Sequence, residues 1–178
     1  MTIINLTGHR SYQKDKKTGL WVSKLAFEGH DMYSSELFER LVDLFYAYYM
    51  KHTDIEIVIS GMAIGVDLAG AVAALEANRK VHAYVPYKGH GNWRTFYGEV
   101  HRDVIEQAEL VSYGADKFSV ESLLQRNKDM VHASDYVLAL HNGDKGGGTA
   151  HCIRYAESQG KKVVNLWSQW DKHKHRKS

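Results

Sequence analysis

Apolar residues recur along the chain in two alternating patterns. Short, nearly continuous apolar runs such as IEIVIS (55–60) and DYVLALH (135–141) are typical of strands buried on both faces. Between them, apolar residues return every three or four positions, as in SELFERLVDLFYAYYM (35–50), which predicts amphipathic helices. The patterns predict strands at 2–7, 55–60, 80–85, 109–113, 135–141 and 162–167. They predict helices at 35–50, 65–77, 95–108, 120–133 and 149–159.

Strands that alternate with helices of roughly 10–15 residues indicate βαβ units. We therefore expect an α/β fold in three layers, with a mostly parallel sheet covered by helices on both faces. Pro86 is expected to end the third strand. Residues 11–33 are long for a connection of this kind, which usually has ~2–6 residues. They are expected to hold a hairpin, LWVSKLAF (20–27), or a lid.

Composition favours an ordinary soluble protein with one domain. The chain has 178 residues, of which 44% are hydrophobic and 25% charged, with a formal net charge of +2. One domain is expected over residues 1–170, followed by a basic, disordered tail over 171–178. The single cysteine excludes an intramolecular disulfide, and no signal peptide or apolar membrane span is found. A cytoplasmic protein without a membrane partner is therefore expected.

Glycines gather where the predicted strands end and the next helices begin. Because all strand-to-helix loops of a parallel sheet emerge at its carboxyl edge, these glycines are expected to face one site. The loops are TGHR (7–10), SGMAIGVD (60–67), PYKGHGNWR (86–94) and HNGDKGGGTA (141–150). In the last loop, GGGT directly precedes a helix, so backbone amides, the Thr149 hydroxyl and the helix N-terminus could hold a phosphate.

One such loop is not sufficient for binding. The helix dipole contributes only ~0.3–1 kcal/mol for an exposed anion, and each charge-assisted hydrogen bond contributes ~1.5–3 kcal/mol. Micromolar affinity needs ~8 kcal/mol, so two or three loops must act together. The favoured ligand is therefore a nucleotide-like anion. Gly61 and Gly65 have a second interpretation, as small residues that let a helix lie close to a sheet.

Three segments together are similar to a known superfamily. TGHR, SGMAIGVD and QRNKDMVHASDYVLALHNGDKGGGTAHCIRYA resemble the YpsA-like branch of the SLOG superfamily, over residues 2–167. That superfamily includes the DNA-processing protein DprA and the LOG-type phosphoribohydrolases. The resemblance implies a Rossmann-like fold that binds nucleotides or their derivatives at the carboxyl ends of the strands. It also implies self-association into a homo-oligomer.

Matching motifs imply which residues bind the ligand. The positions are Gly8, His9, Arg10, Ser60, Gly61, Gly65, Asp67, Gly147, Gly148 and Thr149, with Arg126 and Asn127 in support. One position departs from the LOG-type pattern. Those enzymes carry a catalytic glutamate three residues after the threonine, where this chain has Cys152, and the nearest acid in that helix is Glu157.

Several residues near the same edge have two interpretations. Arg10 is favoured as a phosphate clamp because its planar fork suits phosphate oxygens. Asp67 is either a carboxylate placed by the dipole of its helix, or a ribose acceptor or acid. Trp93, like Tyr87, either stacks on a base or covers a loop, and Arg94 follows it at the ligand edge.

Three functions remain open at this stage. The leading prediction is a nucleotide-binding sensor or sequestering protein with a small-molecule partner and no certain cofactor. The alternatives are a nucleotide N-glycoside hydrolase, with Asp67 or Glu99 as general acid or base, and a DprA-like single-stranded DNA module. The DNA module is not favoured, because the net charge shows no marked basic excess. The histidines share no metal-ligand spacing, so no metal is predicted.

Overall fold

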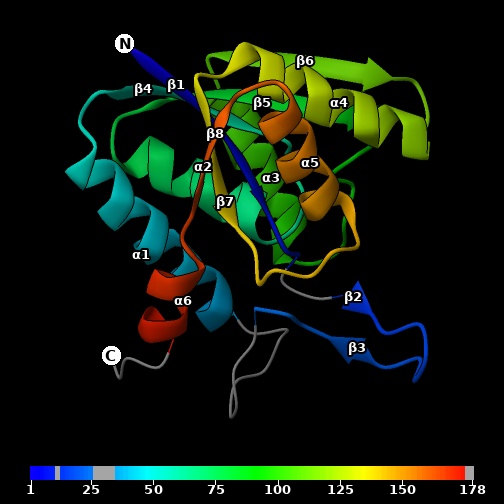
Figure 1. Ribbon diagram of the computed structural model, residues 1–178. Helices are drawn as coiled ribbons and strands as arrows, with labels where there is room; N and C mark the ends of the chain where they lie inside the picture. Colours follow the sequence, from blue (N-terminus) through cyan, green and yellow to red (C-terminus); the bar gives the residue numbers. More distant parts are fainter. Residues whose placement is uncertain (11–12, 26–34, 175–178) are drawn as a thin grey trace.

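The computed structural model describes residues 1–10, 13–25 and 35–174, and a six-stranded parallel sheet forms its centre (Figure 1). The order of the strands is β6-β5-β4-β1-β7-β8. Their bounds are β1 (Thr2–Gly8), β4 (Ile55–Ser60), β5 (Lys80–Tyr87), β6 (Leu110–Ala115), β7 (Tyr136–Leu140) and β8 (Lys162–Asn165). The helices are α1 (Ser35–Lys51), α2 (Val66–Glu76), α3 (Phe96–Gln107), α4 (Val120–Ala133), α5 (Gly148–Ser158) and α6 (Trp167–His173).

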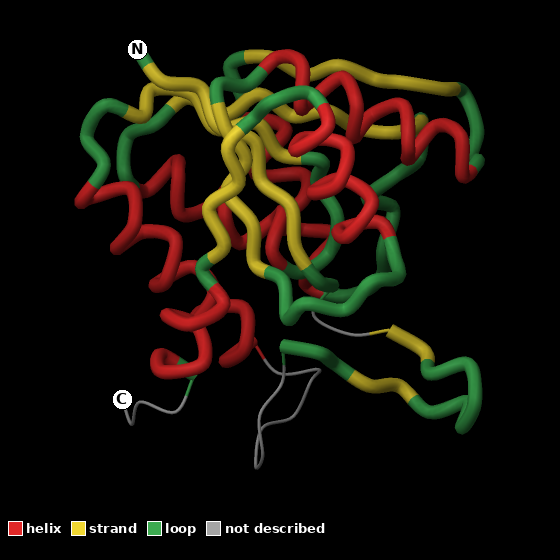
Figure 2. Tube along the Cα trace, viewed as in Figure 1, coloured by secondary structure: helices red, strands yellow, loops and turns green. Residues whose placement is uncertain are grey.

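Helices cover both faces of the sheet, which confirms the predicted α/β fold (Figure 2). α1, α2, α3 and α6 form one layer, and α4 and α5 form the other. The alanine-rich α2 lies close to the sheet, because a methyl group on Gly70 would come within 2.5 Å of the Leu6 side chain. α4 begins with the capping box of Ser119 and Ser122, which satisfies amide groups at its N-terminus.

The strand order places a topological switch point beside β1. From β1 the chain adds β4, β5 and β6 on one side, and then returns to add β7 and β8 on the other side. The loops after β1 and β7 therefore leave the sheet next to each other but lead to helices on opposite faces. Ligands of open α/β sheets bind in the crevice that such a divergence creates.

Two expectations about the irregular segments need correction. β5 continues through Pro86 to Tyr87, and this is tolerated because its pairing with β4 ends at Ala83, so no ladder partner on that side needs the missing N–H. A hairpin does exist in the segment 11–33, but it joins β2 (Gln13–Lys14) to β3 (Trp21–Val22), so its turn precedes the predicted one. Part of the predicted segment, residues 26–34, lies outside the described residues.

The predicted disordered tail is wrong for its first residues. α6 contains Asp171 and His173, and it is anchored by Trp170, which is fully buried. The sequence shows no helical periodicity here, because SQWDKH (168–173) contains only one buried apolar residue, Trp170. Residues 175–178 lie outside the described residues.

Candidate functional site

A cavity of about 490 Å³ opens at the carboxyl edge of the sheet, at the switch point. It is lined by residues from the loops after β1, β4, β5 and β7, together with one side of α4. The predicted binding residues in its lining are Gly8, His9, Arg10, Asp67, Arg126, Asn127, Gly147, Gly148 and Thr149. The glycine-bearing loops thus converge on one space, as their positions after parallel strands predict.

The turn between β4 and α2 places Asp67 at this cavity. The Ser60 hydroxyl donates to the Asp67 carbonyl oxygen at 2.8 Å and accepts from the Met62 amide at 3.1 Å. Met62 has a φ of 64°, which is uncommon for a residue with a side chain. Gly65, at the N-cap of α2, has a φ of 104° and a ψ of −122°, a conformation open essentially only to glycine.

Gly61 leaves room for the two charged groups on the cavity wall. A methyl group at this position would lie 2.8 Å from the Arg126 guanidinium carbon and 2.9 Å from an Asp67 carboxylate oxygen. Arg126 also donates to the Gly61 carbonyl oxygen at 2.8 Å and to the side-chain oxygen of Asn127 at 3.0 Å. Gly61 therefore acts through packing, and the side chains that it admits are the ones that line the cavity.

Burial shifts the pKa values of both Asp67 and Arg126 toward their neutral forms. The Asp67 side chain is buried, and this raises its pKa to about 6, against the opposing effect of the Arg126 charge and of a hydrogen bond from the Ala63 amide. Burial also lowers the pKa of Arg126, while the Asp67 carboxylate opposes that shift. A carboxyl group that titrates near neutral pH at a cavity is a candidate for ligand binding or proton transfer.

The loop between β7 and α5 supplies the amides. Gly147 is the N-cap of α5, with a φ of 93°, and provides no side chain to bond the first amides of the helix. Methyl groups added to Gly146, Gly147 or Gly148 would meet no atom within 4 Å, so this loop is open on its outer side. Gly147, Gly148 and Thr149 line the cavity, so the first amides of α5 and the positive end of its dipole lie beside it, an arrangement that suits an anion.

His9 joins the β1 loop to the β7 loop. Its Nε2 lies 3.0 Å from the side-chain oxygen and 3.1 Å from the backbone nitrogen of Asn142. Burial lowers the pKa of His9 to about 4, so the ring is neutral at pH 7. From the hairpin side, Lys24 lines the cavity and forms an ion pair with Asp144 at 2.5 Å. Nothing in the sequence pattern indicated Asn142 or Lys24, because both contacts join segments far apart in the chain.

The β5 loop contributes His90 to the cavity wall. Its Nδ1 lies 3.3 Å from Nε2 of His101, and burial lowers the pKa of His90 to about 3 and that of His101 to about 4. The Trp93 ring packs against both histidines, at centroid distances of 5.0 and 5.4 Å. Trp93 therefore supports the position of His90 and is absent from the cavity lining.

Six predicted residues lie outside the lining of the cavity: Ser60, Gly61, Gly65, Trp93, Arg94 and Glu99. The first three shape the turn that carries Asp67. Arg94 and Glu99 are exposed to solvent beside the N-terminus of α3. The structure thus brings Asp67 to the cavity and leaves Glu99 away from it.

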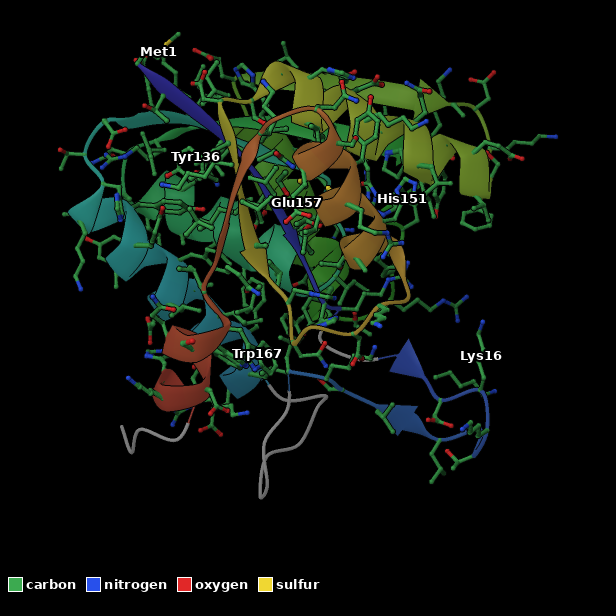
Figure 3. The ribbon with its side chains drawn as sticks, viewed as in Figure 1. Met1, Lys16, Tyr136, His151, Glu157 and Trp167 are labelled. Atoms are coloured by element: carbon green, nitrogen blue, oxygen red, sulfur yellow. The ribbon has the colours of Figure 1, made fainter. Side chains whose placement is uncertain are left out.

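α5 carries two further residues of interest beside the cavity. His151 lines the cavity, and its buried Nδ1 has no hydrogen-bond partner among the described residues. Cys152 is buried in an apolar cluster that includes Val131 and Ala156, and burial raises the pKa of its thiol to about 11. Figure 3 shows Glu157 farther along α5, toward its C-terminal end. This helix therefore presents a histidine to the cavity, and no acid.

Among the described residues, no three histidine, cysteine or acidic side chains lie together as the ligands of a metal ion would. Within the same residues, each helix is too short or too polar to cross a membrane.

A profile of the family of DNA recombination-mediator protein A matches residues 35–177. This range contains most of the sheet and all the helices. Comparison with curated proteins gives no significant match.

Solved structures with the same fold have low sequence identity. The structural-genomics target TM1055 superposes with a TM-score of 0.56 and 18% identity, over 97% of this chain and 79% of its own. DNA processing protein A from Helicobacter pylori, described for its single-stranded DNA binding mode, superposes with a TM-score of 0.60 and 16% identity, over 92% of this chain and 64% of its own. The molybdenum cofactor carrier protein from Chlamydomonas reinhardtii superposes with a TM-score of 0.53 and 16% identity, over 92% of this chain and 75% of its own. These neighbours confirm the Rossmann-like α/β fold, whereas membership of the YpsA-like branch of the SLOG superfamily stays a prediction.

Proposed function

We propose that this chain, which belongs to the family of DNA recombination-mediator protein A, binds a nucleotide or nucleotide-derived anion at the carboxyl edge of its sheet. In this proposal it acts as a sensor or sequestering protein. The single observation that carries the proposal is the cavity at the switch point, which is lined by the uncapped N-terminus of α5 and by the cationic side chains of Arg10 and Arg126.

The charges of the cavity favour an anionic ligand. Arg10, Lys24 and Arg126 are its cationic side chains, and Asp67 is its only carboxylate among the described residues. Lys24 is already paired with Asp144, but Arg10 forms no ion pair with any described carboxylate. Arg10 is exposed, so it can turn toward a phosphate without loss of a buried contact.

Family membership favours a second candidate function, the binding of single-stranded DNA. The backbone phosphates of DNA would bind the same amides and arginines, so the cavity alone does not distinguish a nucleotide ligand from single-stranded DNA. The chain spans only 64% of the H. pylori DNA processing protein and 54% of the one from Streptococcus pneumoniae. Hydrolysis of an N-glycoside stays a prediction, with Asp67 in the role of the acid. Self-association also stays a prediction.

Ligand-free protein should be stabilised against heat by one or more members of a panel of nucleoside mono- and diphosphates, cyclic nucleotides, NAD and ADP-ribose. Arg10→Ala should weaken the affinity for the best ligand by about tenfold or more, because a charge-assisted hydrogen bond is lost. Arg102→Ala is the matched control, since Arg102 is also exposed but lies on α3, outside the cavity lining. Thermal shift and calorimetric titration provide the measurements.

Absence of any thermal shift, in protein shown by mass spectrometry to be free of bound small molecules, would contradict the proposal. A gel-shift series with single-stranded DNA at increasing salt tests the second candidate function, DNA binding. Single-stranded DNA that binds more tightly than every nucleotide of the panel, with the same loss in Arg10→Ala, would replace the nucleotide as the ligand.

A further inference from the structure

A row of aromatic rings leads from the cavity to the solvent. His90 lines the cavity, and its ring meets the edge of Tyr87 at a centroid distance of 5.3 Å. Tyr87 in turn meets Phe118 at 5.5 Å, again in a T-shaped arrangement. The row therefore joins the loop after β5 to the turn before α4.

The outer end of this row is an exposed apolar surface. Phe118 is 61% exposed, and so is Val120, the first residue of α4. Val120 also lines the cavity, as do Leu123 and Leu124 one turn later. An apolar rim thus continues directly into a cavity whose lining also includes the α5 N-terminus and the side chains of Arg10 and Arg126. Large exposed aromatic side chains at the mouth of a cavity commonly mark a ligand contact.

From this juxtaposition we propose that Phe118 stacks on the base of a nucleotide whose phosphate is bound by Arg10 and the α5 amides. This inference rests on the proposed function and assigns the contact that separates a nucleotide from a bare sugar phosphate. The role expected of Trp93 is thereby given to Phe118, because Trp93 is packed against His90 and His101 while Phe118 has a ring open to solvent.

The polarity of the rim fits a base better than a second phosphate. Within the described residues, its aromatic and aliphatic members carry no charge, and burial lowers the pKa of His90 to about 3, so that ring is neutral as well. Stacking on a π face tolerates any base, so the contact should favour nucleotides as a class without choosing one base.

The test compares ligands that share a phosphate but differ in the base. AMP, GMP, CMP, UMP and ribose 5-phosphate are titrated calorimetrically into the wild type, Phe118→Ala, Phe118→Trp and Tyr113→Ala. Phe118→Ala should weaken the best-bound nucleotide by about tenfold and leave ribose 5-phosphate unchanged. Phe118→Trp should retain the nucleotide affinity. Neither Phe118 nor Tyr113 lines the cavity, but Phe118 belongs to the row of rings that reaches His90 in the lining. Tyr113→Ala is therefore the matched control, since Tyr113 is 51% exposed and lies on β6.

The outcomes distinguish a failure of the stacking contact from a failure of the proposed function. Equal affinities of the wild type and Phe118→Ala for the nucleotide would overturn the stacking contact alone. An equal loss for nucleotide and ribose 5-phosphate would also overturn it, because Phe118 would then act by shaping the site. If the wild type bound neither class of ligand, the proposed function would fail together with this inference.

Discussion

Replacing Gly61 by alanine is expected to destabilise the protein and to weaken binding of the anion at the same time. The added methyl group would lie less than 3.0 Å from both the Arg126 guanidinium and the Asp67 carboxylate, closer than a methyl group can approach. Arg126 is held by the Gly61 carbonyl oxygen and by Asn127, so it cannot move without breaking these bonds. Overpacking of this kind costs about 1–3 kcal/mol in the free energy of unfolding.

Gly146→Ala is the control for Gly61→Ala. No atom lies within 4 Å of a methyl group at Gly146, and its backbone is not in the left-handed region. Its stability should therefore change little or rise by a few tenths of a kcal/mol. Urea unfolding and titration with the best ligand measure both effects. Because Gly146 lines the cavity, it is the control for stability only, and ligand affinity is compared with the wild type. If Gly61→Ala were as stable as Gly146→Ala and bound the ligand as tightly as the wild type, Gly61 would not control the positions of Arg126 and Asp67.

The second large effect is expected from Asp67→Asn, which should make the ligand-free protein more stable at neutral pH. The pKa of Asp67 is raised from 3.8 to about 6 by burial, so ionisation is less favourable in the folded chain than in the unfolded chain. A shift of this size corresponds to roughly 2–3 kcal/mol. Asparagine resembles the neutral acid in shape and has no charge to bury.

The sign of the pH dependence follows from which state releases the proton first. As the pH rises from about 4 to about 6, the unfolded chain loses the Asp67 proton while the folded chain retains it, so the wild type loses stability relative to the variant. The difference is complete above about pH 6 and vanishes below the unfolded pKa of 3.8. Urea unfolding at pH 4, 5, 6 and 7.5 measures it.

A stability difference that does not depend on pH would show that the carboxylate is not penalised by burial. A variant less stable than the wild type at pH 7.5 would show that the attraction between the Asp67 carboxylate and the Arg126 charge outweighs desolvation. If the expected result is found, the chain retains a carboxylate at a net cost in stability, which is typical of residues kept for function.

The fold followed from the sequence because its strongest patterns are local. IEIVIS and YVLAL read as strands buried on both faces, and the three-to-four spacing of α1 is unambiguous. Two elements have short-range patterns too weak to place: α6, which the sequence does not predict, and the hairpin, whose turn it places elsewhere. α6 buries a single tryptophan, and the hairpin pairs two residues on each strand. The sequence predicts a strand end at Pro86 because it does not show where β4 stops pairing with β5, a tertiary property that makes the proline tolerable.

The sequence predicts the site only in outline, because most of its side-chain contacts are not local. Strand-end glycines indicate which edge of a parallel sheet carries a ligand, and that rule placed the loops around Gly8, Asp67 and Gly147 correctly in space. It does not say which side chains turn inward. The contact of His9 with Asn142 and the exposed ring of Phe118 depend on how distant segments pack, and no periodicity encodes them.

A crystal structure of the protein with the nucleotide that stabilises it most would test the central claim directly. The account predicts a phosphate oxygen within hydrogen-bond distance of the amides at the start of α5 and of the Arg10 guanidinium, in the cavity between the loops after β1 and β7. A nucleotide bound elsewhere on the molecule, or bound in this cavity with its phosphate turned away from those groups, would contradict it.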